Sequence, residues 1–236
     1  MDSAYVTLSR QSGLMNEMRM VANNIANANT AGYRQQGLVF SEYVQAAGQG
    51  PSLSMARAQV RNTSLQPGVL TQTNGQFDFA IEGEGFFLLE TPSGNRLTRA
   101  GSFASNGQGE LVSVDGYRVL DVNGAPIFVP PDAVSVDAGS DGTLSAGGQP
   151  LGQIGVYAPT DPAGLVREGG VTFRADGGFE PVENPKVLRG FLEGSNVNAI
   201  EQVARLVEIQ RAYELGQSFL EAEDERVRGA LKALMR

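Results

Sequence analysis

The residues in this chain with the potential for catalysis are mainly carboxylates flanked by glycines. Glu82 and Glu84 lie two positions apart beside the aromatic pair Phe86-Phe87, and a pair of carboxylates is the catalytic arrangement of glycoside hydrolases. Gly83 and Gly85 flank Glu84, however, and they indicate a turn rather than a strand that holds both carboxylates on one face. A carboxylate-pair hydrolase on a β scaffold is therefore an alternative function that no second motif supports.

Two other groups of residues invite a binding-site interpretation. The glycines around Glu84 together with Gly101 suggest a phosphate loop, but the spacing is wrong for a Walker loop and no Gly-Lys-Ser/Thr sequence occurs. Asp161, Asp176 and Glu180 suggest a calcium site, but the spacing of an EF-hand is absent. We therefore expect tight turns and solvated acids at these positions, with no metal and no cofactor.

The composition excludes whole classes of chemistry. The chain contains no His and no Cys, which rules out serine–histidine hydrolases, thiolate or His-containing zinc sites, iron–sulfur clusters and redox cysteines. Only carboxylate, lysine or tyrosine catalysis remains. The 26 acidic residues outnumber the 18 basic ones and give a net charge of −8, so we expect no nucleic-acid partner.

The sequence shows no secretory signal and no membrane-spanning segment. The first eight residues carry an acid at Asp2 and lack a basic region followed by an apolar stretch. A continuous run of about 18 apolar residues is also absent, so no membrane insertion is expected. These features favour a cytoplasmic protein, an inference that fails for any protein exported without a cleaved signal.

Charge and glycine content divide the chain into a β-rich centre and two different ends. Residues 76–194 have a net charge of −9 and hold 21 of the 30 glycines, whereas residues 1–75 and 195–236 carry +2 and −1. In the centre, turns such as Asp115-Gly116 and Asn123-Gly124 separate short apolar runs, a pattern typical of antiparallel hairpins. We therefore expect an antiparallel β domain over 76–194, with an extended connector over 33–75.

The first end has the periodicity of a helix over residues 3–28. Its apolar stripe follows alternating spacings of four and three residues, which is a period near 3.5. Asn29-Thr30-Ala31-Gly32 provides the stop signal. The predicted stripe consists of Ala4, Leu8, Gln11, Met15, Met18, Ala22 and Ile25.

The last end predicts a helix of about 40 residues, with Ser195 or Asn196 as its N-cap. A narrow stripe of this length cannot be buried by the helix alone and needs a partner helix. The predicted fold is therefore α+β, with terminal segments 1–32 and 195–236 paired in a coiled-coil-like domain. The stripe consists of Val203, Leu206, Gln210, Tyr213, Gln217, Leu220, Asp224, Val227, Leu231 and Leu234.

Three separated motifs resemble those of the bacterial flagellar rod and hook proteins. The first is Ala-Asn-Asn-Ile-Ala-Asn-Ala-Asn-Thr-Ala-Gly-Tyr-Arg at 22–34. The second is Gly-Glu-Gly-Phe-Phe at 83–87 followed by Thr-Arg-Ala-Gly-Ser-Phe at 98–103. The third is Glu-Gly-Ser-Asn-Val-Asn at 193–198 with Gln-Arg-Ala-Tyr-Glu at 210–214. The opening residues most resemble proximal rod proteins, and distal rod proteins come next.

This resemblance implies a structural role rather than an enzymatic one. Proteins of this family stack helically into the rod of the flagellar basal body, in the periplasmic space, with copies of themselves and with other rod and axial proteins. They leave the cell through the flagellar type III export apparatus without a cleaved signal. A secreted adhesin is the third alternative, and the two terminal stripes argue against it. The assembly interface implied here consists of Leu8, Met15, Met18, Ala22, Asn23, Ile25, Asn27, Val203, Leu206, Gln210, Tyr213, Gln217, Leu220, Val227, Leu231 and Leu234. We further hypothesise that the asparagines at 23, 24, 27 and 29 form hydrogen bonds between packed helices.

Overall fold

A computed structural model describes residues 2–45, 53–130, 133 and 135–234, and the side chains of residues 7–38, 62–130, 133 and 135–233. The chain divides into two compact units. The helical unit comprises Met1–Ala26, Gln36–Ser64 and Asn198–Arg236. The β unit comprises Asn27–Gln35 and Leu65–Val197.

These units differ from the expected division at two places. Residues 27–35 belong to the β unit, although most of them were assigned to the terminal helical domain. Residues 36–64 belong to the helical unit, although they were expected to form part of a connector. The second difference arises because β1 (Gln36–Gln45) and β2 (Leu53–Thr63) form an antiparallel hairpin that contacts the first helix.

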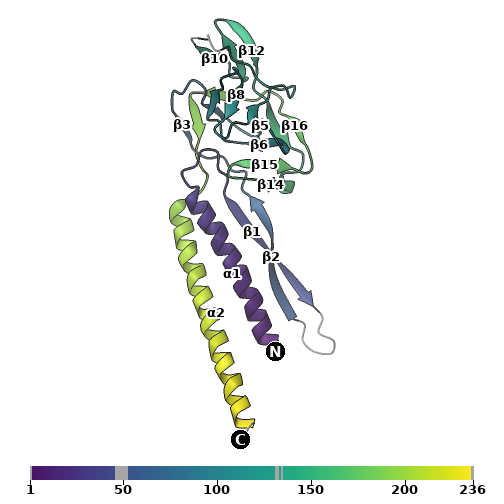
Figure 1. The fold of residues 1–236 in the computed structure, drawn as a ribbon, viewed down its shortest axis with the longest axis vertical. Helices are drawn as coiled ribbons and strands as arrows, with labels where there is room; N and C mark the ends of the chain where they lie inside the picture. Colours follow the sequence, from purple (N-terminus) through teal and green to yellow (C-terminus); the bar gives the residue numbers. More distant parts are fainter. Residues whose placement is uncertain (1, 46–52, 131–132, 134, 235–236) are drawn as a thin grey trace. The chain divides into compact units, whose positions relative to one another are not determined.

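Two long helices form the rest of the helical unit (Figure 1). α1 extends over Asp2–Ala26 and α2 over Ala199–Leu234. α1 ends two residues before the expected end at residue 28. α2 begins later than expected, because Asn198 is its capping residue: the Asn198 Oδ1 atom accepts hydrogen bonds from the backbone N–H groups of Ile200 and Glu201 at 3.1 and 3.4 Å. In the described part of the chain, neither helix has the length and apolar character that crossing a membrane requires.

The β unit consists of short strands that pair antiparallel throughout the described residues. This confirms the α+β class and the antiparallel central domain. The strands are β3 (Leu70–Gln72), β4 (Phe79–Ile81), β5 (Phe86–Thr91), β6 (Gly94–Thr98), β7 (Phe103–Ser105), β8 (Leu111–Ser113), β9 (Arg118–Val119), β10 (Val136–Ala138), β11 (Thr143–Ala146), β12 (Gln149–Gln153), β13 (Val156–Pro159), β14 (Leu165–Arg167), β15 (Thr172–Ala175), β16 (Phe179–Pro181), β17 (Val187–Arg189) and β18 (Phe191–Glu193), with a 3₁₀ turn at Pro162–Gly164.

One large sheet organises this unit. Its main path has the order β14-β15-β6-β5-β9-β8-β7, and off this path β13 pairs with β5 and β16 pairs with β13. A three-stranded sheet has the order β10-β11-β12, and the pairs β17-β4 and β18-β3 bring the end of the unit back to its beginning. The predicted Asp115-Gly116 and Asn123-Gly124 turns are present, and both glycines have the left-handed φ of +81° that such turns use.

Strand β5 separates two hydrophobic cores. Phe87 and Leu89 belong to the larger core, whereas Phe86 and Leu88 belong to the smaller one. All four side chains are buried. A strand that is buried on both faces has no need of polar residues on alternate positions, which explains why this segment is a continuous apolar run in the sequence.

Candidate functional site

The two terminal helices pack against each other antiparallel (Figure 1). Polar side chains connect them along the seam. The Asn24 amide donates to the Gln202 Oε1 atom at 3.1 Å, Arg205 forms an ion pair with Glu17 at 2.6 Å, and the Gln11 Nε2 atom donates to the backbone oxygen of Tyr213 at 2.8 Å. These three links fix the register of the helices, because each partner is a defined position rather than an interchangeable apolar side chain.

Asn24 bears out the hypothesis of hydrogen bonds between packed helices. It is fully buried. Besides its bond to Gln202, the side chain donates to the backbone oxygen of Gln36 at 2.9 Å and accepts from the backbone N–H of Gln36 at 3.0 Å. Asn24 therefore fastens both α2 and the start of β1 to α1. Asn23 and Asn29 are exposed, and the Asn27 side chain accepts from the Thr30 hydroxyl within the β unit.

One of the two predicted rows of α2 faces the seam, and the other row is displaced by one residue. Leu206, Tyr213 and Leu220 face the seam as expected and are half-buried. The second row of seam residues begins at Gln202 and Ile209, which are buried, and not at Val203 and Gln210. A shift of one position turns a side chain by about 100° around a helix. Six residues of the predicted α2 stripe are exposed, namely Val203, Gln210, Gln217, Asp224, Val227 and Leu231. The side chain of Leu234 is not among the side chains that the structure describes.

The buried face of α1 also differs from its predicted stripe. Glu17, Val21 and Asn24 are buried, as is the predicted Gln11. Among the other predicted residues, Met15, Met18 and Ile25 are half-buried, Leu8 and Ala22 are exposed, and the side chain of Ala4 lies outside the described ones. The difference arises because α1 contacts the β1–β2 hairpin as well as α2, so two of its faces are covered. Asn27 of the predicted interface is half-buried and belongs to the β unit.

The three sequence motifs converge on one buried ion cluster in the β unit. The Glu193 carboxylate lies 2.8 Å from Nη2 of Arg34 and 3.0 Å from Nη1 of Arg99. The side chains of Arg34 and Glu193 are each 1% exposed, and that of Arg99 is 3% exposed. Burial lowers the pKa of the Arg34 guanidinium to about 10, while Glu193 opposes this shift. Arg34 therefore remains charged at neutral pH. Burial also lowers the pKa of Arg99, and Glu193 opposes that shift as well.

Hydrogen bonds to the backbone complete this cluster. Arg99 donates to the oxygens of Ile81 and Gly83 at 3.3 and 2.6 Å, and Arg34 donates to the oxygen of Gln66. Glu193 accepts from the backbone N–H of Gly68 at 2.8 Å. Neighbouring peptide groups thus use part of the hydrogen-bonding capacity of the buried charges, which favours burial of an ion pair. Among the described residues, the Nε atoms of Arg34 and Arg99 have no hydrogen-bond partner.

The same place requires Gly32 of the first motif. Its φ of +70° is left-handed, and a Cβ atom on this residue would lie 2.2 Å from the backbone nitrogen of Ala100. The backbone N–H of Gly32 donates to the oxygen of Glu193 at 2.7 Å. Asn196 of the third motif accepts from the N–H of Gln35 at 2.6 Å. The chain segments before α2 and after α1 are therefore tied to each other and to the second motif.

Arg167 of β14 contacts residues next to this cluster. The Arg167 guanidinium lies 4.3 Å from the ring centre of Tyr33 and 4.6 Å from that of Phe173, which are favourable cation–π distances. It also donates to the backbone oxygen of Arg34. Burial lowers the pKa of Arg167, and burial raises that of Tyr33. Arg34, Arg99 and Arg167 are therefore all used in contacts within the fold of this unit.

The sequence motifs point to these residues, but their roles were not predicted. Segments 22–34, 98–103 and 193–198 each contain a single charged residue, namely Arg34, Arg99 and Glu193. A charge inside a segment that is otherwise small or apolar requires an opposite charge when it is buried. The one acid and two bases of these three segments were the available signal of an ion cluster.

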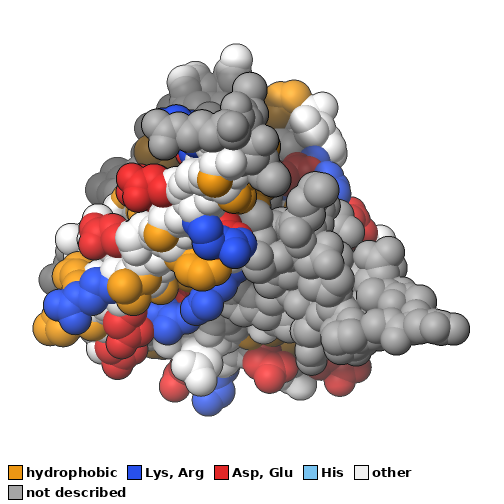
Figure 2. All heavy atoms as spheres, turned by 90° about the horizontal axis from the view of Figure 1, so that it is seen from below, with side chains coloured by type: hydrophobic (Ala, Val, Ile, Leu, Met, Phe, Trp, Pro, Cys, Tyr) orange, Lys and Arg blue, Asp and Glu red, His pale blue; other side chains and the backbone are white. Residues whose placement is uncertain are grey.

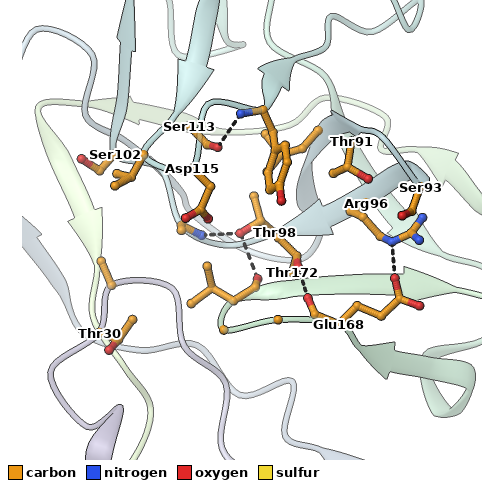
Figure 3. Close-up of a pocket in the computed structure, with 18 of the residues that line it drawn as sticks. Thr30, Thr91, Ser93, Arg96, Thr98, Ser102, Ser113, Asp115, Glu168 and Thr172 are labelled. Carbon is orange, nitrogen blue, oxygen red and sulfur yellow. Dashed lines mark hydrogen bonds and ion pairs between the residues drawn. The ribbon is translucent and has the colours of Figure 1, made fainter.

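The β unit has a groove with a volume of about 740 Å³ (Figure 3). Its polar side chains already have partners within the protein. Arg96 forms an ion pair with Glu168 at 2.7 Å, Thr98 donates to the oxygen of Val171 at 3.0 Å, and the Thr172 hydroxyl bonds the oxygen of Glu168. The groove thus shows a network that joins β6, β14 and β15.

The candidate catalytic and metal-binding residues do not form a site. Glu82 and Glu84 are both exposed on the turn before β5, where Gly83 and Gly85 have φ values of +113° and +110°. Asp161 accepts from the backbone N–H of Ala163 in the 3₁₀ turn. Asp176 forms an ion pair with Arg174, and Glu180 lies in β16. Within the described residues, no group of three or more acids is placed to hold a metal ion.

Three segments of the chain match known protein families. Residues 5–34 match the flagella basal body rod protein family, residues 80–146 match the D1 domain of the flagellar hook protein FlgE/F/G, and residues 188–232 match the C-terminal region of the flagellar basal body rod FlgEFG proteins. Each match contains one of the three motifs in full, and together they include Arg34, Arg99 and Glu193.

Whole-chain relatives lead to the same family. The flagellar basal-body rod protein FlgF of Mesorhizobium japonicum is 39% identical over 90% of this chain and 89% of its own length. FlgF of Caulobacter vibrioides is 38% identical over 99% and 98%. The flagellar basal-body rod protein FlgG of Bacillus subtilis is 30% identical over 94% and 95%. The chain therefore belongs to the flagellar basal-body rod protein family, with greater identity to these two FlgF proteins than to this FlgG protein.

Proposed function

We propose that this chain is a structural subunit of the bacterial flagellar rod, the drive shaft that transmits torque from the motor to the hook. One observation of the geometry carries the proposal. The three motifs meet at Glu193 and its two arginine partners, so the residues that relate this chain to rod proteins hold one unit together instead of forming a reactive site. A subunit that transmits torque needs such internal rigidity.

We infer that the helical unit provides the assembly interface. α1 and α2 meet along a narrow seam and leave apolar residues such as Leu8 and Val203 exposed in the single chain. Exposed apolar side chains on a long helix favour burial against further helices. The proposed packing is coiled-coil-like, with copies of this chain and with other rod and axial proteins as partners. The residues of the predicted interface remain candidates for it.

We also propose an export route for this subunit and a position for it in the rod. Export through the flagellar type III apparatus without a cleaved signal agrees with a sequence that shows no secretory signal. The subunit would lie in the periplasmic part of the rod. A proximal position is favoured over a distal one, because the two FlgF relatives are more similar to this chain than the FlgG relative is.

No catalytic activity is part of this proposal. The exposed pair Glu82 and Glu84 lies on a turn rather than in a cleft, and the acids considered for calcium are used by a turn and by an ion pair. These are the roles expected of surface acids in a structural protein.

The test is electron microscopy of basal bodies from a strain that lacks this protein. We expect truncated rods and non-motile cells, both restored by a plasmid copy of the natural sequence. Complete rods that lack only the hook would move the protein to the distal end of the rod. Complete basal bodies with hooks, in cells that swim, would overturn the proposed function.

A further inference from the structure

The longer of the two terminal helices extends past the shorter one. Gln11 lies opposite Tyr213, and the antiparallel register places Asp2, the first residue of α1, near about residue 222 of α2. The residues 224–234, here named the α2 overhang, therefore continue for roughly 16 Å beyond the start of α1. Figure 1 shows α2 ending well beyond the N-terminus of α1.

The overhang continues the face that α2 buries against α1. Leu220 is half-buried in the seam, and Val227 and Leu231 follow it at spacings of seven and four residues on the same side of the helix. Val227 is 47% exposed and Leu231 is 54% exposed. The seam thus ends while its apolar stripe continues. Seen from below, the described surface shows hydrophobic side chains beside acidic and basic ones (Figure 2).

A groove lies between α1 and α2, higher along the same pair of helices. Its volume is about 440 Å³. Leu14 lines it from α1, and Leu215 and Phe219 line it from α2. Leu215 is 71% exposed and Phe219 is 48% exposed. Arg10 is the one charged residue among those that line the groove, so its wall is apolar with a basic edge.

A buried amide, that of Gln11, lies beneath the groove, and its oxygen is closed to solvent. Gln11 is 7% exposed, and its Nε2 atom is used in the bond to Tyr213. Among the described residues, its Oε1 atom has no hydrogen-bond partner. Leaving a buried acceptor unpaired costs about 1–3 kcal/mol. Gly216 leaves room for this amide, since a Cβ atom there would lie 2.1 Å from Nε2 of Gln11.

We propose that the α2 overhang of a second copy of this chain occupies this groove, an interface that rests on the proposed rod function. The occupant cannot be the chain's own overhang, because Phe219 and Val227 lie on one continuous helix about 12 Å apart along its axis. Val227 and Leu231 of the second copy would pack on Leu215 and Phe219.

The polar groups of the overhang complement those of the groove. Within the overhang, Arg228 forms an ion pair with Asp224 at 2.9 Å. Asp224 would in turn face Arg10 at the edge of the groove. The groove and the overhang are different surfaces of one chain. Such a head-to-tail contact generates an open helical assembly when the rotation between neighbouring copies does not close a ring.

Cysteine cross-linking tests this interface directly, because the natural chain contains no Cys. The Phe219→Cys/Leu231→Cys variant is expressed as the sole copy, and purified basal bodies are oxidised and separated on a non-reducing gel. We expect bands at two and more times the mass of the chain. The control is Phe219→Cys/Glu225→Cys, since Glu225 points away from the Val227–Leu231 side of the overhang. This control and each single variant should remain monomeric.

A second cysteine pair across the same contact, Leu215→Cys/Val227→Cys, tests the interface independently in case the geometry of the first pair prevents a disulfide. All four replaced positions are exposed, so circular dichroism should show unchanged folding. If both pairs reach the basal body and stay monomeric, or cross-link only to a different protein, the inference is wrong while the rod function stands. If cells without the protein build complete rods, the proposed function itself fails.

Discussion

Replacing Glu193 by Gln should destabilise the β unit strongly. The substitution keeps the size of the side chain and removes the one acid that faces both Arg34 and Arg99. Two buried guanidinium groups would then lack a counter-charge, since both are at most 3% exposed. Breaking a buried ion pair costs about 3–5 kcal/mol, because the remaining charge is left uncompensated. We expect a loss in this range for Glu193→Gln.

The matched control is Glu90→Gln, which removes an ion pair at the surface. Glu90 lies 2.9 Å from Arg118, and the two side chains are 39% and 43% exposed. This distance lies between the 2.8 and 3.0 Å of the buried cluster, so the main difference between the two sites is burial. Exposed pairs contribute about 0–1 kcal/mol, and we therefore expect little change in the stability of this variant.

Amide hydrogen exchange in the full-length protein measures both effects within the β unit. β5 lies between the two cores, and its amides exchange through opening of the unit. A loss of about 3 kcal/mol should accelerate exchange over Phe86–Thr91 by at least about 100-fold in Glu193→Gln. Replacing Glu193, Arg34 and Arg99 together by methionine should recover part of the loss, since no unpaired charge remains. Unchanged exchange in Glu193→Gln, or an equal change in Glu90→Gln, would refute this account of the cluster.

Three further predictions concern the helices, a turn and the absence of catalysis. Leu97→Asp places a charge in a fully buried core position and should lower the cellular protein level, which immunoblots measure. Leu220→Asp in the seam should leave the β unit folded but keep the protein out of rods, so that cells do not swim in motility assays. Normal swimming with the Leu220→Asp protein in the rods would contradict the role of the helices. Hydrogen bonds from the backbone and hydroxyl of Thr143 hold the pKa of Asp141 below its ordinary value of 3.8, so this carboxylate stabilises the fold above that value and the contribution disappears as the pH falls through the lower folded pKa. Thermal unfolding should therefore show a smaller loss of Tm on acidification in Asp141→Asn than in the natural protein, and parallel curves would contradict it. Purified natural protein and Glu84→Gln should show the same negligible glycan cleavage, and a rate that depends on Glu84 would support the hydrolase alternative.

The sequence by itself determined the features that depend on local patterns. Both helices extend over nearly the predicted ranges, because a 3.5-residue period and its stop signals are properties of neighbouring residues. The Asp115-Gly116 turn formed as predicted, since only glycine adopts its φ of +81° easily. The motifs also identified the family, which the whole-chain relatives confirm.

Only the tertiary structure decided which helix faces are buried. α1 contacts both α2 and the β1–β2 hairpin, and a second partner cannot be recognised from the periodicity of one helix. Val21 and Asn24 are therefore buried, whereas Ala22, which the periodicity places on the buried stripe, is exposed. On α2, the rows that begin at Gln202 and Val203 differ by one residue, and the seam selects Gln202 because it bonds Asn24.

The ion cluster was likewise decided by chain packing. Arg34, Arg99 and Glu193 are separated by 65 or more positions in the sequence, and no local preference brings them together. Each one belongs to a recognisable motif, but a motif does not state which other charge compensates its own. The physical reason is that a buried charge is tolerated only with its partner in place, and that partner is supplied by the folded chain and not by neighbouring residues.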